Sequence, residues 1–172
     1  GTLLGLKATI AVDLGVESTN KGIAATSIFP ACCAVANAYH WKGMHIEGLG
    51  IVTNKSFYCA YRGYGKDKAV KFIESALDLV ARELNMTPEE VRFRNFIQPD
   101  EFPYKQINHY TYDSGDYPAT LNKALEMLDV HSWRKKQKEL RKQGKHIGIG
   151  VAFCIEPAGV AVRNCQMGGI TH

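Results

Sequence analysis

Apolar side chains recur at helical spacing between residues 66 and 84, which is the clearest pattern in the chain. Its apolar positions are Ala69, Ile73, Ala76, Leu77, Val80 and Leu84. Charged residues recur on the other side, and we expect them to face solvent: Lys68, Lys71, Glu74, Asp78 and Arg82. Apolar residues three or four positions apart share one face of an α-helix. The pattern therefore predicts an amphipathic helix over residues 66–84.

Residues typical of helix N-termini predict two further helices. Thr87 can cap a helix, Pro88 suits its first position, and Glu90 can complete a capping box. Asp116 can cap another helix that runs through Leu128. We expect the buried positions of this later helix to be Leu121, Ala124, Leu125 and Leu128.

A basic stretch over residues 132–143 also predicts a helix, which Gly144 would end. Residues 98–115 contain several tyrosines, have prolines nearby and show no periodicity. This composition predicts an ordered loop.

Three stretches rich in β-forming residues predict strands near the two ends of the chain, at residues 3–14, 44–53 and 147–155. Residues 27–39 are apolar and small, and fit either a short buried helix or a packed loop. Strands at the ends with several helices between them indicate an α+β fold with a mixed sheet, in a single domain over residues 1–172.

The composition is that of a globular domain, with 45% apolar and 22% charged residues. No apolar run is long enough to span a bilayer and nothing resembles a signal peptide, so we expect no membrane association. The net charge is +4 over the whole chain, while residues 134–145 alone hold seven basic residues and one acidic residue. This excess fits a solvated surface helix better than a nucleic-acid-binding surface, and we expect no nucleic-acid partner.

Cysteines and histidines show no metal-binding spacing. The five cysteines form no C-x-x-C pair, and the six histidines form no H-E-x-x-H motif. The odd number of cysteines, without a secretion signal, favours reduced thiols in a cytoplasmic protein. We therefore expect no metal ion bound directly by protein side chains.

The loop Ala-Tyr-Arg-Gly-Tyr-Gly at residues 60–65 is the first candidate for chemistry. Its two glycines allow the backbone to approach a ligand closely, and it precedes a long helix whose N-terminus can bind an anion. Its tyrosines could stack on a planar ligand. An ordinary strand-to-helix loop explains the same residues.

A second candidate lies at residues 153–156, where Phe153, Cys154 and Glu156 end the last predicted strand. A phenylalanine there is usually a core residue, and a lone carboxylate such as Glu156 is usually solvated. Cys154 could be a nucleophile, but no histidine stands in a catalytic pattern with it, so a small buried thiol is the simpler interpretation.

Three segments together resemble the molybdopterin-binding subunit of the xanthine dehydrogenase family, which includes aldehyde oxidoreductases and aerobic CO dehydrogenase. The first runs from the loop at residues 60–65 through the helical region to Asn95. The others are residues 102–117, with Phe-Pro-Tyr and Tyr-Asp-Ser-Gly-Asp-Tyr, and residues 148–159, with Gly-Ile-Gly-Val-Ala-Phe and Glu-Pro-Ala-Gly. Their order and spacing fit the family, so the chain is expected to be part of a molybdenum-cofactor-binding domain and a fragment of a longer subunit.

The resemblance implies hydroxylation of a C–H carbon with oxygen derived from water. The cofactor would be molybdenum-molybdopterin, in its cytosine dinucleotide form, with 2Fe-2S clusters and FAD on partner subunits or domains. The partners would be the remainder of the molybdopterin subunit, an Fe-S subunit, an FAD subunit and a small-molecule substrate. The family's catalytic glutamate would lie beyond residue 172, so we expect no catalytic residue within this chain.

The resemblance also implies roles for particular residues. Arg62 would lie at the molybdenum, and with Gly63 it would contact the cofactor. Tyr64 would line the substrate pocket, Phe153 would face it from the other side, and Cys154 would touch the substrate beside Phe153. Glu156 is expected to be structural.

Two departures from the family pattern reduce the range of expected substrates. CO dehydrogenase carries a copper-binding cysteine directly after the loop arginine, where this chain has Gly63, so CO oxidation is not expected. Pro30 falls near the position of the arginine that binds purines in purine hydroxylases, which argues against a purine. The expected function is part of a hydroxylase for an aldehyde or an N-heterocyclic compound. The alternative is a non-catalytic structural or interaction fragment, and either way the isolated chain is expected to be inactive.

Overall fold

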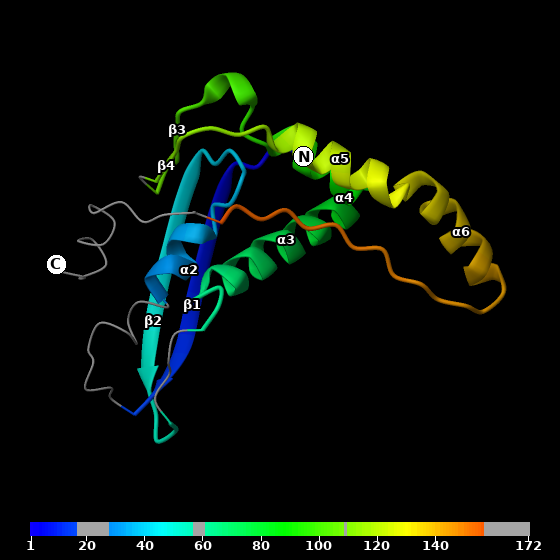
Figure 1. The fold of residues 1–172 in the computed structure, drawn as a ribbon. Coiled ribbons are helices and arrows are strands. Elements are labelled where there is room, and N and C mark those ends of the chain that lie inside the picture. Colours follow the sequence, from blue (N-terminus) through cyan, green and yellow to red (C-terminus); the bar gives the residue numbers. More distant parts are fainter. Residues whose placement is uncertain (17–27, 57–60, 109, 157–172) are drawn as a thin grey trace.

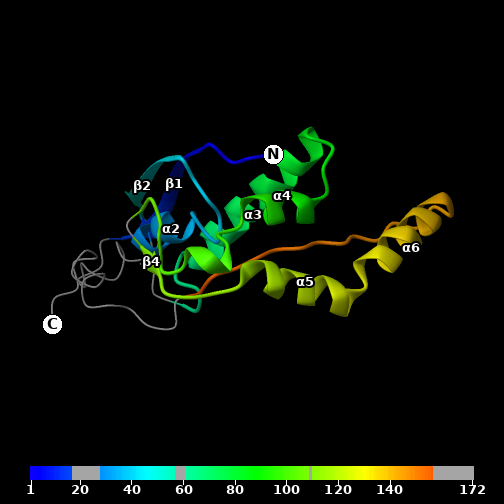
Figure 2. The ribbon, with the colours of Figure 1, turned by 90° about the horizontal axis from the view of Figure 1, so that it is seen from above.

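The computed structural model describes residues 1–16, 28–56, 61–108 and 110–156 (Figure 1). Two long strands, β1 (Gly5–Gly15) and β2 (Gly43–Val52), lie side by side, with helix α2 (Ile28–Ala34) between them in sequence. Helix α3 (Lys66–Glu83) runs at an angle to the strands and extends to one side of them, and α4 (Pro88–Asn95) follows it. Seen from above, α5 (Tyr117–Leu128) and α6 (Val130–Lys142) form an arm that extends away from the sheet (Figure 2).

The strand predictions at residues 3–14 and 44–53 are confirmed by β1 and β2. The two strands are parallel and in register from Gly5 opposite Gly43 onward, with an irregularity between Asp13 and Gly15. A second pair, β3 (Tyr104–Lys105) and β4 (Thr111–Tyr112), is antiparallel and separate. The expected mixed sheet is therefore not confirmed, because the described strands form two separate two-stranded sheets. The fold contains both helices and strands, as the predicted α+β class requires.

The predicted strand at residues 147–155 is wrong. The segment has no regular secondary structure in the described residues. Two of its backbone N–H groups bond to side chains: Phe153 N donates to Glu74 and Ile155 N donates to Asn37. Side chains therefore take the place of a neighbouring strand.

The helix predictions are largely confirmed. α3 begins at Lys66 as expected, and it buries Ala69, Ile73, Leu77 and Ala81. α4 carries the predicted capping box, in which the Thr87 hydroxyl accepts from Glu90 N and the Glu90 carboxylate accepts from Thr87 N. The residues that could form a helix or a packed loop at 27–39 contain α2, and residue 27 itself lies outside the described residues.

The region predicted as an ordered loop, residues 98–115, also contains the short 3-10 helix η1 (Pro99–Glu101) and the β3–β4 pair. Glu101 accepts a hydrogen bond from Gln98 N and lies 2.8 Å from His40 Nε2. These contacts attach the region to the turn that follows α2.

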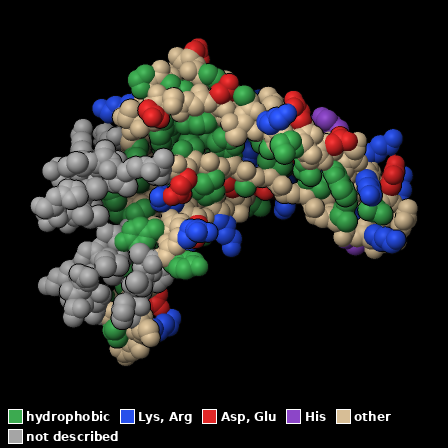
Figure 3. Space-filling model, in the orientation of Figure 1, with side chains coloured by type: hydrophobic (Ala, Val, Ile, Leu, Met, Phe, Trp, Pro, Cys, Tyr) green, Lys and Arg blue, Asp and Glu red, His purple; other side chains and the backbone are tan. Residues whose placement is uncertain are grey.

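The arm formed by α5 and α6 exposes apolar surface that its sequence pattern predicts to be buried. Leu121 is buried and Leu125 is half-buried, but Ala124 and Leu128 are exposed. Met127 is 79% exposed, and apolar side chains are visible over the arm in Figure 3. α6 is the predicted basic surface helix, with most of its side chains in solvent.

The core lies where α2 and the turn after it, α3 and α4 meet the C-terminal segment. Its most buried apolar members include Ala31, Val35, Tyr39, Ile73, Leu77, Val91, Phe96, Leu121 and Phe153. The Tyr39 and Phe96 rings stack with centroids 5.4 Å apart. Burial of this apolar surface supplies the main free energy that holds these elements together.

Candidate functional site

The loop before α3 adopts a backbone conformation that requires glycine. Gly63, Tyr64 and Gly65 all have positive φ, at 91°, 48° and 89°. The loop closes on itself, because Tyr64 N donates to Tyr61 O at 3.0 Å and Lys66 N donates to Gly63 O at 2.9 Å. A Cβ atom at Gly63 would lie 2.8 Å from the Asp67 side chain. A larger residue at position 63 would therefore need both the positive φ and a shift of the Asp67 side chain.

The loop presents its arginine to solvent at a helix start. Arg62 is exposed, Tyr61 is 86% exposed and Tyr64 is partly buried. Gly65 is the N-cap of α3 and provides no side-chain cap. A helix N-terminus without a side-chain cap, next to the Arg62 guanidinium, favours binding of an anionic group. The Asp67 carboxylate in the first turn of α3 repels such a group. Ala60, which opens the motif, lies outside the described residues.

Phe153 lies in the core. It is 7% exposed, and its ring packs against Phe96 at 4.8 Å and Tyr117 at 5.5 Å between centroids. The ring therefore anchors the C-terminal segment between α4 and α5.

Cys154 and Glu156 point the other way along this segment, and both are exposed. The interpretation of Cys154 as a small buried thiol is therefore wrong, because the side chain next to the buried Phe153 ring faces outward. Glu156 Oε1 lies 2.5 Å from Nζ of Lys66, the first residue of α3. The ion pair brings the end of the segment to the loop that carries Arg62.

The Cys154 thiol is not activated in this environment. Burial raises its pKa above the ordinary value, and the charges of Glu156 and Glu74 raise it further. Lys66 acts in the opposite direction but does not outweigh them. The thiol is therefore neutral near pH 7.

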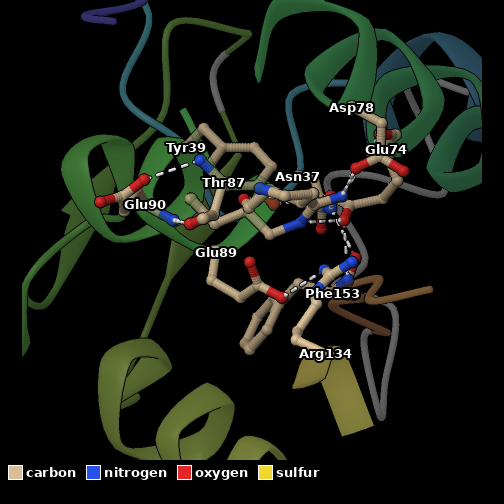
Figure 4. Close-up of polar contacts among 11 residues, drawn as sticks. Asn37, Tyr39, Glu74, Asp78, Thr87, Glu89, Glu90, Arg134 and Phe153 are labelled. Carbon is tan, nitrogen blue, oxygen red and sulfur yellow. Dashed lines mark hydrogen bonds and ion pairs between the residues drawn. The ribbon is translucent and has the colours of Figure 1, made fainter. Parts of the chain in front are cut away.

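A buried polar cluster centred on Glu74 was not predicted from the sequence (Figure 4). Glu74 was expected to face solvent, but it is only 4% exposed. Its carboxylate accepts from Arg92 Nε at 2.8 Å, Tyr39 OH at 2.6 Å, Asn37 Nδ2 at 2.9 Å and Phe153 N at 2.8 Å. Glu74 directly follows Ile73 at the edge of the apolar face of α3, and this position was the available signal for its burial.

Arg92 is the cationic partner of this cluster and is fully buried. Its Nη1 donates to Pro88 O, and its Nη2 lies 2.9 Å from Asp78 Oδ1, in an ion pair without hydrogen-bond geometry. Burial opposes the charged form of Arg92, but the negative charges of Glu74 and Asp78 raise its pKa overall. A buried charge with this many partners is stable where an unpaired one would not be.

Elsewhere, the described residues form a surface hollow but neither a metal-binding group nor a membrane span. A surface hollow lined by Asn85, Met86, Glu90, Phe93 and Arg94 lies at the C-terminal end of α3, far from the Arg62 loop. Within the described ranges, no group of three or more His, Cys, Asp or Glu side chains could hold a metal ion. No helix in the same ranges combines the length and apolar character of a membrane span.

Comparisons with known proteins agree with the resemblance found in the sequence. A family model for the molybdopterin cofactor-binding domain matches residues 1–96. The carbon monoxide dehydrogenase large chain of Afipia carboxidovorans is 34% identical over 146 residues, covering 78% of this chain and 18% of that protein. The nicotine 6-hydroxylase large subunit of Paenarthrobacter nicotinovorans is 33% identical, covering 71% of this chain and 15% of that protein.

A solved structure gives the same result over nearly the full chain. Quinoline 2-oxidoreductase from Pseudomonas putida 86 matches with a TM-score of 0.88 and 27% identity, covering 98% of this chain and 22% of that one. The chain thus spans about a fifth of the length of these relatives. It belongs to the molybdopterin cofactor-binding domain family and matches part of the molybdopterin-binding subunit of the xanthine dehydrogenase family.

Proposed function

We propose that this chain is part of a molybdenum hydroxylase that oxidises an aldehyde or an N-heterocyclic compound with oxygen derived from water. The observation that carries the proposal is the family match over residues 1–96, which includes the arginine loop. The relatives named for nicotine and quinoline oxidation support a heterocyclic substrate. Gly63 and Pro30 argue against CO and purines, as the sequence comparison with the family implies.

In this proposal Arg62 and Gly63 contact the cofactor, and Tyr64 and Cys154 contact the substrate. The positive charge of Arg62, the uncapped start of α3 and the close backbone at Gly63 fit an anionic pterin-bound centre. The bound cofactor would supply the oxygen-transfer and electron-accepting chemistry. Phe153, proposed from the resemblance to face the substrate, would act mainly through the segment that its buried ring anchors.

The remaining assignments follow from the family. We propose that residues 1–172 form one partial domain, completed by the rest of the molybdopterin subunit. The cofactor would be the cytosine dinucleotide form, and electrons would pass to 2Fe-2S and FAD partners in the cytoplasm. The isolated chain would neither turn over aldehydes nor retain stoichiometric molybdenum.

The test is made in the complete enzyme that contains this chain. Molybdenum per subunit and dye-coupled oxidation of quinoline, benzaldehyde, xanthine and CO are measured for the wild type, Arg62→Ala and Arg82→Ala. Arg82 is an exposed arginine near the other end of α3 and serves as the matched control. We expect oxidation of quinoline or benzaldehyde, which Arg62→Ala lowers by about a hundredfold or more while Arg82→Ala does not.

Two results would overturn the proposal. Wild-type rates and molybdenum content in Arg62→Ala would remove the role of the loop. A complete enzyme that holds no molybdenum and oxidises none of the four compounds would favour the non-catalytic fragment.

A further inference from the structure

Two buried side chains hold the backbone of residues 153–155 in place of a neighbouring strand. Asn37 Nδ2 donates to Phe153 O at 2.7 Å, and Ile155 N donates to Asn37 Oδ1 at 3.2 Å. The amide of Asn37 thus offers one donor and one acceptor to the segment, as a peptide group of an adjacent strand would. Glu74 Oε2 accepts from Phe153 N at 2.8 Å and holds the other side of the same residue. Figure 4 shows Asn37, Glu74 and Phe153 together.

The two side chains are themselves fixed. Asn37 is 2% exposed, and its Nδ2 also donates to Glu74 Oε1 at 2.9 Å. Its backbone has φ 47°, a left-handed conformation that asparagine tolerates better than most residues. Glu74 is held in turn by Arg92 and Tyr39. The pair therefore forms a rigid clamp, here called the Asn37–Glu74 clamp.

The clamp determines which side chains of the segment face outward. With the Phe153 ring in the core and its backbone bonded on both sides, the next residue, Cys154, must point away from the core. Two residues further on, Glu156 reaches Lys66 at the start of α3. A shift of one residue along the segment would exchange the inward and outward side chains.

We propose that Asn37 and Glu74 are positioning residues of the candidate site: they fix residues 153–156 in one register against α3, so that Cys154 and Glu156 lie beside the Arg62 loop. The proposal rests on the proposed function only in treating that loop as part of the site. The clamp can be tested without cofactor or substrate.

Asn37→Gly is the sharpest variant, because glycine adopts the same left-handed backbone and only the clamping amide is lost. Asn85→Gly is the matched control, since Asn85 also has positive φ, at 52°, and is exposed at the far end of α3. Both variants are made in the intact protein without added ligand. Hydrogen exchange of peptides covering residues 151–156 and α3 is followed by mass spectrometry, and Cys154 alkylation by iodoacetamide is followed as a function of pH.

For Asn37→Gly we expect exchange over residues 153–155 to rise about tenfold, as loss of one or two hydrogen bonds produces, while α3 stays protected. We also expect the inflection of the Cys154 alkylation profile to move to lower pH. The segment would carry the thiol away from the surroundings that now raise its pKa, namely burial and the carboxylates of Glu156 and Glu74. Asn85→Gly should change neither readout.

An exchange rate and an alkylation profile that match those of Asn85→Gly would overturn the proposal. Equal acceleration throughout α3 and α4 would also overturn it, because the effect would then be general loosening of the fold. Neither readout depends on molybdenum. A failure of the clamp is therefore distinguishable from a failure of the proposed enzymatic function.

Discussion

Lys66 and Glu156 form an ion pair across 90 positions of sequence, and this contact joins the first residue of α3 to the end of the C-terminal segment. Glu156 is 55% exposed in its side chain, so solvent screens the pair and its contribution to stability is small. Its importance is geometric. It brings the segment that carries Cys154 to the loop that carries Arg62.

Glu156→Gln should lower the pKa of the Cys154 thiol, because the Glu156 charge is one of the groups that raise it. The free energy of unfolding should change by less than about 1 kcal/mol. The pH dependence of Cys154 alkylation measures the first effect, and urea denaturation measures the second. Glu139→Gln on exposed α6 is the control, and an unchanged thiol pKa in Glu156→Gln would contradict the observed arrangement.

Glu74→Leu should be strongly destabilising. It leaves the buried Arg92 with only Asp78 as a charged partner, and breaking a buried pair in this way costs about 3–5 kcal/mol. Glu83→Leu, an exposed change on the same helix, should cost less than about 0.5 kcal/mol. The double variant Glu74→Leu/Arg92→Met should recover part of the loss, because no fully buried guanidinium is then left short of partners, and the Asp78 carboxylate that loses its partner is 37% exposed. Equal costs for Glu74→Leu and Glu83→Leu in denaturant unfolding would refute the buried cluster.

Gly63→Ala should destabilise the loop by more than about 1 kcal/mol, since it combines positive φ with a contact of 2.8 Å to Asp67. Gly148→Ala is the matched control, because a Cβ there meets nothing within 4 Å. Chemical denaturation compares the two variants. If both had the same unfolding free energy, the strained loop conformation would be wrong.

Asp13 should make stability depend on pH in the acid range. Hydrogen bonds from Lys55, Thr53 and Gly15 N lower its pKa from 3.8 to about 2. The stabilisation that Asp13 contributes is therefore fully present above pH 3.8, the pKa in the unfolded chain, and is lost as the pH falls through about 2, the pKa in the folded protein. Asp13→Asn should flatten this part of the curve of unfolding midpoint against pH, whereas Asp100→Asn on exposed η1 should leave it unchanged. Superimposable curves for the wild type and Asp13→Asn would rule the interaction out.

The helices could be predicted from sequence because their signals are local. The capping box of Thr87 and Glu90 lies within four residues, and the apolar face of α3 recurs within single turns. The segment at residues 147–155 was misassigned as a strand because its partners are side chains 79 to 118 positions away. The exposed Ala124 and Leu128 show the same limit, because periodicity reports an apolar face but not what covers it.

The candidate site was predictable in part. The glycine loop stood out through its residue types, and its positive φ values agree with them. The Asn37–Glu74 clamp did not stand out, because a single charged residue at the edge of a helix face resembles an ordinary surface position. Only the fold brings Asn37, Glu74 and Phe153 together.

In the proposed enzyme, the Arg62 loop and the Cys154 segment form one site for cofactor and substrate. The most direct measurement is the rate of Cys154 alkylation by iodoacetamide in the molybdenum-loaded enzyme, with and without saturating quinoline or benzaldehyde, whichever is oxidised. We expect that the substrate slows alkylation and that the alkylated enzyme loses turnover. Full activity after complete modification of Cys154, at a rate that the substrate does not change, would contradict it.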